Sequence, residues 1–339
     1  MKRLRILALM HSDLVPPAGA TGADMMMVPW KTEYDVLSAL RELGHEVLPL
    51  GVVSDLAQIR DAVEEVRPHI AFNLLEQFDG HAIYDQNVVA YLELLGVAYT
   101  GCNPRGLILG RDKALSKKVL AYHRIPCPRF LVCRWGRTVR LPKRFSYPVI
   151  VKALKEDSSW GISQASVVHS DDKLQERVVF LQEKTGDDAI IEQYIEGREL
   201  YVSVVGNQRL EVFPVWELKL DELAADAYPI ATERVKFNRS YREKYNIESC
   251  RADLPAELEA RIQKLAKRVY RALDLSGYGR IDVRLDADLR PWVLEVNPNP
   301  DIGYGEELAE SAHSAGISYP RLLQRILNLG LRWRARLGS

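Results

Sequence analysis

The segment that most constrains the fold of this chain runs from residue 277 to residue 300, GYGRIDVRLDADLRPWVLEVNPNP. Its apolar residues alternate with polar ones on both sides of a polar turn, which is typical of a half-buried β-hairpin. With the turn centred between Asp288 and Leu289, Asp282 lies opposite Glu295. Two carboxylates about 4 Å apart repel by roughly 4 kcal/mol at an effective dielectric near 20. Another group must therefore compensate this repulsion.

The same face of the hairpin allows two explanations. Arg280 would lie opposite Asn297, so the face carries oxygen donors together with an arginine. Carboxylate and amide oxygens are ligands that Mg²⁺ prefers, and this ion keeps water and substrate phosphates as further ligands. A divalent ion between Asp282 and Glu295 would remove their repulsion. The alternative is a solvated ladder in which Arg280 and Arg284 neutralise the acids.

Residues 1 to about 100 alternate strand and helix signals, which predicts a parallel sheet covered by helices. The expected strands are 3–9, 45–50 and 69–75, and the expected helices are 32–44, 55–67 and 87–96. Thr32 and Asp35 have the spacing of a capping box at the start of a helix. The turn after the first strand contains no G-x-G-x-x-G, which argues against a dinucleotide site there.

From Asp112 onward, strands and helices come in clusters, which predicts an α+β region after the α/β region. The expected helices are 112–125, 170–186, 255–275 and 318–333, and the expected strands are 148–153, 162–170, about three in a meander over 189–218, and the hairpin. The polar stretch from Asp221 to Asp253 has weak periodicity and is expected to be loop.

Length and charge limit the possible functions. A chain of 339 residues is too long for one small core, so two or three lobes are expected. Lys plus Arg and Asp plus Glu are 46 each, so no global field attracts nucleic acid or an anionic membrane. The apolar runs are shorter than the ~18 residues of a membrane span, and ILALM after MKRLR is too short for a signal peptide. We expect a cytoplasmic protein with neither nucleic-acid nor membrane partners.

Two lysines stand where an anion could be held. Lys152 ends a strand of Val and Ile, and the following loop offers the hydroxyls of Ser158 and Ser159 and backbone N–H groups. Such loops can cradle phosphate oxygens. Lys113 lies at a helix start, where a cation opposes the helix dipole, so a neighbouring anion is favoured. For both lysines the alternative is a solvated side chain.

The segment IIEQYIEGRELYV joins two strands through a turn and contains Glu192 and Glu199. An extended backbone there has free donors and acceptors that could read a purine edge, and a carboxylate suits ribose hydroxyls. The alternative is a charged turn without a ligand.

In chain order, GRDKALSKK, PVIVKALKEDSSWGIS, IIEQYIEGRE, TERVKF and GYGRIDVRL…WVLEVNPNP resemble the ATP-grasp ligases, most closely the D-alanine–D-alanine ligase branch. The resemblance covers roughly residues 90–330. It implies an ATP-grasp fold, mixed α/β and α+β, with an N-terminal Rossmann-like parallel-sheet lobe. The implied domains are this lobe at 1–102, a central ATP-grasp subdomain at 103–188, and a C-terminal subdomain with the metal site at 189–339.

The resemblance also implies ATP and two Mg²⁺ ions as cofactors, with Mn²⁺ as a substitute. Catalytic roles would fall on Arg280, Ser158 and Lys236, of which Arg280 would stabilise the transferring phosphoryl group and Lys236 would reach the γ-phosphate. The implied nucleotide-binding residues are Lys113, Lys152 and Ser159 for phosphates, Glu192, Gln193 and Ile195 for adenine, and Glu199 for ribose. The implied metal ligands are Asp282, Glu295 and Asn297.

The implied reaction activates a carboxylate as an acyl phosphate, which an amine converts to an amide with release of ADP and phosphate. The substrates would be small molecules or peptides, and a homodimer is in keeping with the branch. One alternative is a phosphotransferase or carboxylate-activating enzyme with a non-amine acceptor. Another is a nucleotide-binding regulatory protein without turnover.

The chain departs from the branch where substrates bind. The turn MHSDLVPP lacks the Gly-Gly-x-Ser-x-Glu pattern that holds the amine of the first substrate. After the metal asparagine, small and hydroxyl residues that receive the second carboxylate are replaced by PNPDIGYGEE, which contains Asp301, Glu306 and Glu307. These acids would repel a carboxylate. We therefore expect a product other than D-alanyl-D-alanine, from a cationic acceptor or the end of a peptide.

Overall fold

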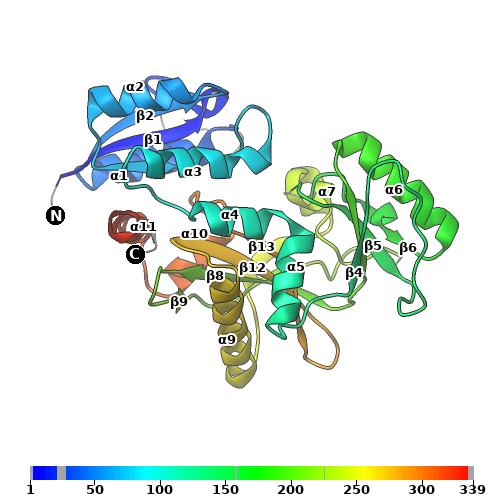
Figure 1. The fold of residues 1–339 in the computed structure, drawn as a ribbon. Helices are drawn as coiled ribbons and strands as arrows, with labels where there is room; N and C mark the ends of the chain where they lie inside the picture. The colour runs from blue at the N-terminus through cyan, green and yellow to red at the C-terminus, as the bar shows by residue number, and fades with distance from the viewer. Residues whose placement is uncertain (1–2, 21–27, 157–158, 225, 335–339) are drawn as a thin grey trace.

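A computed structural model describes residues 3–20, 28–156, 159–224 and 226–334, which form three sheets with covering helices (Figure 1). The first sheet is parallel, in the order β2-β1-β3. Its strands are β1 (Arg5–His11), β2 (Glu46–Val52) and β3 (Ile70–Asn73), and its helices are α1 (Lys31–Glu42), α2 (Leu56–Val66) and α3 (Asp85–Leu94). The predicted N-terminal parallel-sheet lobe is confirmed.

The two faces of the first sheet bury different helices. Side chains alternate across a strand, so Leu7 and Leu9 pack on the side of α2 and α3, while Ile6 and Ala8 pack on the other. That second face is covered by α1 and by α11 (Tyr319–Arg332), the last helix of the chain. The C-terminal helix, red in Figure 1, therefore completes the core of the N-terminal lobe.

The second sheet is antiparallel, in the order β4-β7-β5-β6. Its strands are β4 (Phe130–Cys133), β5 (Val149–Ala153), β6 (Val167–Val168) and β7 (Ala189–Gln193), and the neighbouring helices are α5 (Lys113–Tyr122) and α6 (Asp171–Thr185). Helix α4 (Pro104–Arg111) packs against α3, α5 and the third sheet. The predicted strand 162–170 is mostly wrong, because residues 164–166 form a 3₁₀ turn. Since β7 pairs with β4 and β5, we propose that the subdomain boundary lies after Gln193 rather than at 188–189.

The third sheet has the order β11-β10-β8-β12-β13, and β9 also pairs with β8. Its strands are β8 (Arg198–Val205), β9 (Glu211–Val212), β10 (Trp216–Lys219), β11 (Glu248–Arg251), β12 (Tyr278–Leu285) and β13 (Pro291–Asn297), and its helices are α9 (Ala256–Ala272) and α10 (Glu307–Ser314). The predicted meander is wrong in one respect, because β7 and β8 belong to different sheets.

The polar stretch 221–253 is also more ordered than expected. It contains α7 (Glu233–Phe237), α8 (Arg239–Lys244) and β11. Val235 and Ile247 are buried in a cluster with Trp216 and Leu218. Packing against Trp216 and Leu218 of β10 therefore orders the described residues of the stretch 221–253, although its periodicity is weak.

The capping box at the start of α1 is not formed, so that prediction is wrong. The N-cap position is Trp30, which makes no side-chain cap bond. Thr32 Oγ1 instead donates to Asp301 Oδ1 at 2.8 Å, and Asp35 accepts from Lys31 Nζ at 2.7 Å and from the backbone N–H of Tyr304 at 3.1 Å. A tertiary contact with the loop after β13 has taken the place of a local one.

Across the described ranges, every helix is too short or too polar to cross a lipid bilayer.

Candidate active site

The β12–β13 hairpin has the predicted pairing on its polar face. Asp282 lies opposite Glu295, and Arg280 lies opposite Asn297. The Asp282 side chain is only 5% exposed, which contradicts a solvated ladder. The hairpin therefore carries the two opposed carboxylates that the sequence predicted, with Asp282 buried and Glu295 27% exposed.

One detail of the hairpin differs from the prediction. The turn is one residue tighter, closing between Asp286 and Arg290, and a bulge at Leu294 restores the register. Because the bulge inserts one residue, Val293 and Val296 both face the core. The extra residue on β13 shifts the register by one, so Asp282 still lies opposite Glu295 although the turn is tighter than predicted.

Arg280 compensates one of these acids directly. Its guanidinium makes two hydrogen bonds to Asp282, at 2.8 and 3.0 Å, and a third contact to Glu307 at 3.2 Å. It also stacks over the Tyr201 ring at 4.5 Å. Arg284 does not join this pair and instead binds Glu199 at 2.5 Å. Burial raises the pKa of Asp282 to about 6, although Arg280 opposes this shift.

Lysines surround the second acid. Lys113 Nζ lies 4.0 Å from the Glu295 carboxylate. Burial raises the pKa of Glu295, but the positive charges of Lys113, Lys152, Lys236 and Arg280 outweigh burial and lower it to about 2. Four cations supplied by α5, β5, α7 and β12 therefore converge on one carboxylate. Such a concentration of positive charge suits a polyphosphate.

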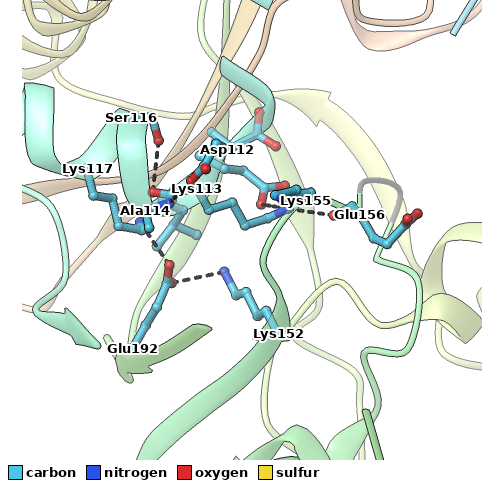
Figure 2. Close-up of polar contacts among 12 residues, drawn as sticks. Asp112, Lys113, Ala114, Ser116, Lys117, Lys152, Lys155, Glu156 and Glu192 are labelled. Carbon is cyan, nitrogen blue, oxygen red and sulfur yellow. Dashed lines mark hydrogen bonds and ion pairs between the residues drawn. The ribbon is translucent and has the colours of Figure 1, made fainter. Parts of the chain in front are cut away.

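Behind these cations lies a buried ion cluster (Figure 2). Glu192 on β7 contacts Lys117 of α5 at 3.0 Å and Lys152 of β5 at 3.2 Å, and the three side chains are at most 8% exposed. Burial raises the pKa of Glu192, but the two lysines outweigh it, so the pKa lies below its usual value. Lys113 Nζ donates to the backbone carbonyl of Glu156. Lys117 was not predicted, although it lies one helical turn after Lys113.

A cleft opens between the second and third sheets, next to these charges. It has an apolar part, formed by Ile150, Ile162, Ile230, Ala231 and Leu294. Its charged part includes six of the groups discussed above: Lys152, Glu199, Lys236, Asp282, Arg284 and Glu295. The apolar part therefore continues into a charged part that contains three cations and three carboxylates.

The loop after β5 is fastened to α7 across this cleft. The backbone N–H of Glu233 donates to the carbonyl of Ile162 at 3.0 Å, and the Glu233 carboxylate accepts from Gly161 N at 3.3 Å. Lys184 pairs with Glu233 at 2.8 Å. Ser159 lines the cleft, whereas Ser158 lies outside the described residues. The loop and the helix that carries Lys236 are thus held together.

Three further predicted site residues are not among the residues that line the cleft: Gln193, Ile195 and Asn297. The side-chain amide of Gln193 donates to the carbonyls of Ser146 and Pro148, at 2.9 and 3.1 Å. Ile195 follows it in the connection between β7 and β8. Asn297 Oδ1 accepts from the backbone N–H of Asn299 at 3.0 Å. Their assignments to the nucleotide and the metal remain predictions.

A second pocket, of about 380 Å³, lies against the N-terminal lobe. Four carboxylates line it: Glu33, Glu76, Glu156 and Asp301. Arg111 also lines it, but this guanidinium is bound to the buried carboxylate of Asp85 at 2.6 and 2.9 Å. The lining is therefore predominantly acidic.

Comparisons with known proteins agree with this geometry. A family model described as "D-ala D-ala ligase C-terminus" matches residues 127–328. The chain belongs to the D-alanine–D-alanine ligase family. The D-alanine–D-alanine ligase of Bordetella petrii is 35% identical, covering 72% of this chain and 71% of that protein. An uncharacterized protein of Sinorhizobium fredii, y4sG, is 33% identical, covering 90% of this chain and 89% of its own length.

Solved structures of the family share the fold. The D-alanine–D-alanine ligase of Bacillus anthracis, solved in complex with ATP, superposes with a TM-score of 0.74 and 25% identity, covering 99% of this chain and all of that one. The ATP-grasp fold is confirmed. This member of the ATP-grasp ligases belongs to the class that forms C–N bonds, and the family uses ATP and Mg²⁺.

The residues of the cleft fit ATP and Mg²⁺. The hairpin face supplies only oxygen donors for a cation, and the surrounding lysines and Arg280 supply the positive charge that phosphates require. In the part of the chain that the structure describes, no three His, Cys, Asp or Glu side chains form a metal site by themselves. A site with two carboxylates and one amide matches an ion that completes its shell with water and phosphate.

Proposed function

We propose that this chain is an ATP- and Mg²⁺-dependent carboxylate–amine ligase that works through an acyl phosphate. The observation that carries the proposal is the convergence of Lys113, Lys152, Lys236 and Arg280 on Glu295, beside a cleft with an apolar slot. A site that only bound a nucleotide would not need an arginine and opposed acids at the phosphate end.

The chain's own groups would do mostly positioning and charge stabilisation. Lys113, Lys152 and Lys236 would hold phosphate oxygens, and Asp282, Glu295 and Asn297 would bind Mg²⁺, which neutralises charge on those oxygens when bound. A carboxylate oxygen of the first substrate attacks the γ-phosphorus, and the bond to ADP breaks. The amine then attacks the acyl carbon, phosphate leaves, and the amine proton is lost to give the amide.

Arg280 would act in the phosphoryl transfer itself. Its guanidinium lies between Asp282 and Glu307, so contact with a phosphoryl oxygen would replace part of this pairing rather than require a new conformation. Ser159 and the loop before α7 would cover the phosphates and exclude water, which would otherwise hydrolyse the acyl phosphate.

The acceptor proposed here is not D-alanine. Asp301 lines the pocket next to the hairpin, and Glu306 lies close enough to it that their charges interact. Burial, together with Asp301 and Glu307, raises the pKa of Glu306 to about 7. An incoming carboxylate would meet further negative charge here, which costs several kcal/mol.

The test is a screen of carboxylate and amine pairs for ADP release, followed by mass analysis of the product. We expect an amide with one ADP per bond. A stable phosphorylated product or a thioester would show a different acceptor class, and ATP binding without any partner-stimulated hydrolysis would refute the ligase. Robust, saturable ADP release with D-alanine as sole substrate would overturn the acceptor assignment alone.

A further inference from the structure

Helix α6 carries a buried arginine that has no acidic partner among the described residues. Arg177 is 7% exposed, and its helix neighbours Leu174, Val178 and Leu181 are buried in the core of the second sheet. Burial lowers the pKa of the guanidinium, and no described carboxylate opposes this shift. Its Nε also lacks a hydrogen-bond partner within the described ranges. A methionine or leucine would fill this position without desolvating a charge, so packing alone gives no reason for an arginine here.

The guanidinium of Arg177 is bound to the loop that follows β5. Its Nη2 donates to the backbone carbonyl of Gly161 and to the hydroxyl of Ser166, the latter at 2.8 Å. The guanidinium also stacks over the Phe180 ring at 4.7 Å, which restricts its rotation. One nitrogen therefore fastens two separate points of the loop to α6.

The backbone of Gly161 is adapted to this attachment. Its φ of 77° lies in the left-handed region that favours glycine, and a Cβ here would lie 2.6 Å from Leu181 Cδ1. The glycine therefore permits a close approach of the loop to α6. On its other side, the N–H of Gly161 donates to the Glu233 carboxylate at 3.3 Å. Gly161 is thus held by Arg177 through its carbonyl and by α7 through its N–H.

The residues next to Gly161 face two different cavities. Ser159 and Ile162 line the cleft between the second and third sheets, whereas Trp160 lines the pocket against the N-terminal lobe. The Trp160 ring also packs against Lys184 of α6 at 4.6 Å. A shift of the Gly161 carbonyl would therefore move Ser159 relative to the cleft.

Resting on the nucleotide binding proposed above for this cleft, we propose that Arg177 is a positioning residue for the phosphates of ATP. It holds the Gly161 carbonyl, so that Ser159 and the neighbouring backbone N–H groups face the β- and γ-phosphates. It acts through the loop and does not itself touch the nucleotide. The loop is then ordered before the ligand binds, which reduces the entropy lost on binding. This gain offsets the unfavourable burial of the guanidinium.

The test compares nucleotides that have or lack the β- and γ-phosphates. Isothermal titration of the full chain in the presence of Mg²⁺ would use AMP-PNP, a non-hydrolysable analogue of ATP, and AMP. Arg177→Met keeps an unbranched side chain and removes the hydrogen bonds to the loop. We expect the AMP-PNP affinity to fall at least about ten-fold and the AMP affinity to change by less than about two-fold. A purely structural role would change both affinities by the same factor.

Three further variants sharpen the test. Lys173→Met, at an exposed position of the same helix, is the matched control and should change neither affinity. Arg177→Lys keeps a donor for the Gly161 carbonyl and should recover part of the AMP-PNP affinity. Gly161→Ala leaves Arg177 in place and displaces the attached carbonyl, so it should also weaken AMP-PNP selectively. Circular dichroism shows whether each variant is folded.

Unchanged AMP-PNP affinity in Arg177→Met, or equal losses for AMP-PNP and AMP, would overturn the inference. If this variant does not fold, unchanged or equally reduced affinities in Gly161→Ala would overturn it instead. Failure of the ligase proposal looks different. Selective loss of AMP-PNP binding, combined with no ADP release from any substrate pair, would keep the role of Arg177 and refute the ligase. Amide formation by a chain whose AMP-PNP affinity is indifferent to Arg177→Met would do the reverse.

Discussion

The cleft between the second and third sheets and the pocket against the N-terminal lobe differ in whether the charges of their buried acids are compensated by cations. In the cleft, Glu192 and Asp282 are paired with Lys or Arg at 3.2 Å or less, and lysines surround Glu295. In the pocket, Glu33 Oε2 has no hydrogen-bond partner among the described residues, and the charge of Asp301 raises the pKa of Glu33 further. The buried acids of the cleft are therefore compensated by nearby cations, whereas the pocket is lined by four carboxylates.

This contrast also separates two energetic roles. The cleft is a preorganised network in which removing an acid leaves cations buried without partners. The pocket holds an acid whose removal relieves an unfavourable burial. The same substitution, Glu to Gln, is therefore expected to have opposite effects on stability in the two places. Four predictions test the contrast, from the largest expected effect to the smallest.

Substitutions of the proposed metal ligand Glu295 and of Arg280 should have the largest effect, which is on the rate of ADP release. Glu295→Gln and Arg280→Ala should each lower the rate of ADP release by about a thousand-fold or more, because metal binding and charge stabilisation drive phosphoryl transfer. The measurement is coupled ADP release, with circular dichroism to show that the variants are folded. Activity within about ten-fold of the parent in either variant would contradict these roles.

Removing the centre of the buried ion cluster should destabilise the fold. Glu192→Gln leaves Lys117 and Lys152 without their anionic partner, both almost fully buried. Breaking a buried pair from one side costs about 3 kcal/mol or more of unfolding free energy, measured by urea denaturation. The matched control is Glu176→Gln on the surface of α6, where the partner Lys173 is exposed. Equal stability of the two variants would show that the cluster is not a coupled unit.

At Glu33, the same substitution is expected to raise the free energy of unfolding instead of lowering it. In the unfolded chain this carboxyl ionises near pH 4.5, but the folded chain retains its proton up to about pH 7. Stability contributed by the protonated form is thus lost as pH rises between these values, and the loss is complete above about pH 7. Glu33→Gln should stabilise the protein by about 3 kcal/mol at pH 8 and by almost nothing near pH 4.5.

The measurement is urea denaturation of the parent and Glu33→Gln across this pH range. Asp301 and Glu306 are present in both proteins, so the difference between them isolates Glu33. A variant that is destabilised equally at both pH values would mean that Glu33 has a structural partner. That result would remove the contrast between the two regions.

The contact that positions Asp301 should have the smallest effect. Thr32→Val removes the hydroxyl that donates to Asp301 and should lower stability by about 1 kcal/mol. A double-mutant cycle with Asp301→Asn should return a coupling energy of similar size. Additive effects would mean that Thr32 acts within its own helix, as the capping-box prediction had it.

Local patterns were sufficient for the hairpin and for most of the elements. Alternation along residues 278–297 predicted the opposition of Asp282 and Glu295, because side chains in a strand alternate with a period of two. The bulge at Leu294 was not predicted, since it depends on where the turn closes. The parallel sheet of the N-terminal lobe followed from helical and strand periodicities, which are also local.

The sequence by itself determined the ATP-grasp pattern, the acidic face of the hairpin and the lysines that accompany it, because these depend on spacing within short segments. Only the tertiary structure decided that Lys117 joins Glu192 and Lys152, that β7 leaves the predicted meander, and that Thr32 turns to Asp301. It also decided that Glu33 is buried, with Oε2 lacking a hydrogen-bond partner among the described residues. Burial and pairing depend on residues far apart along the chain, and no local period encodes which of them will meet.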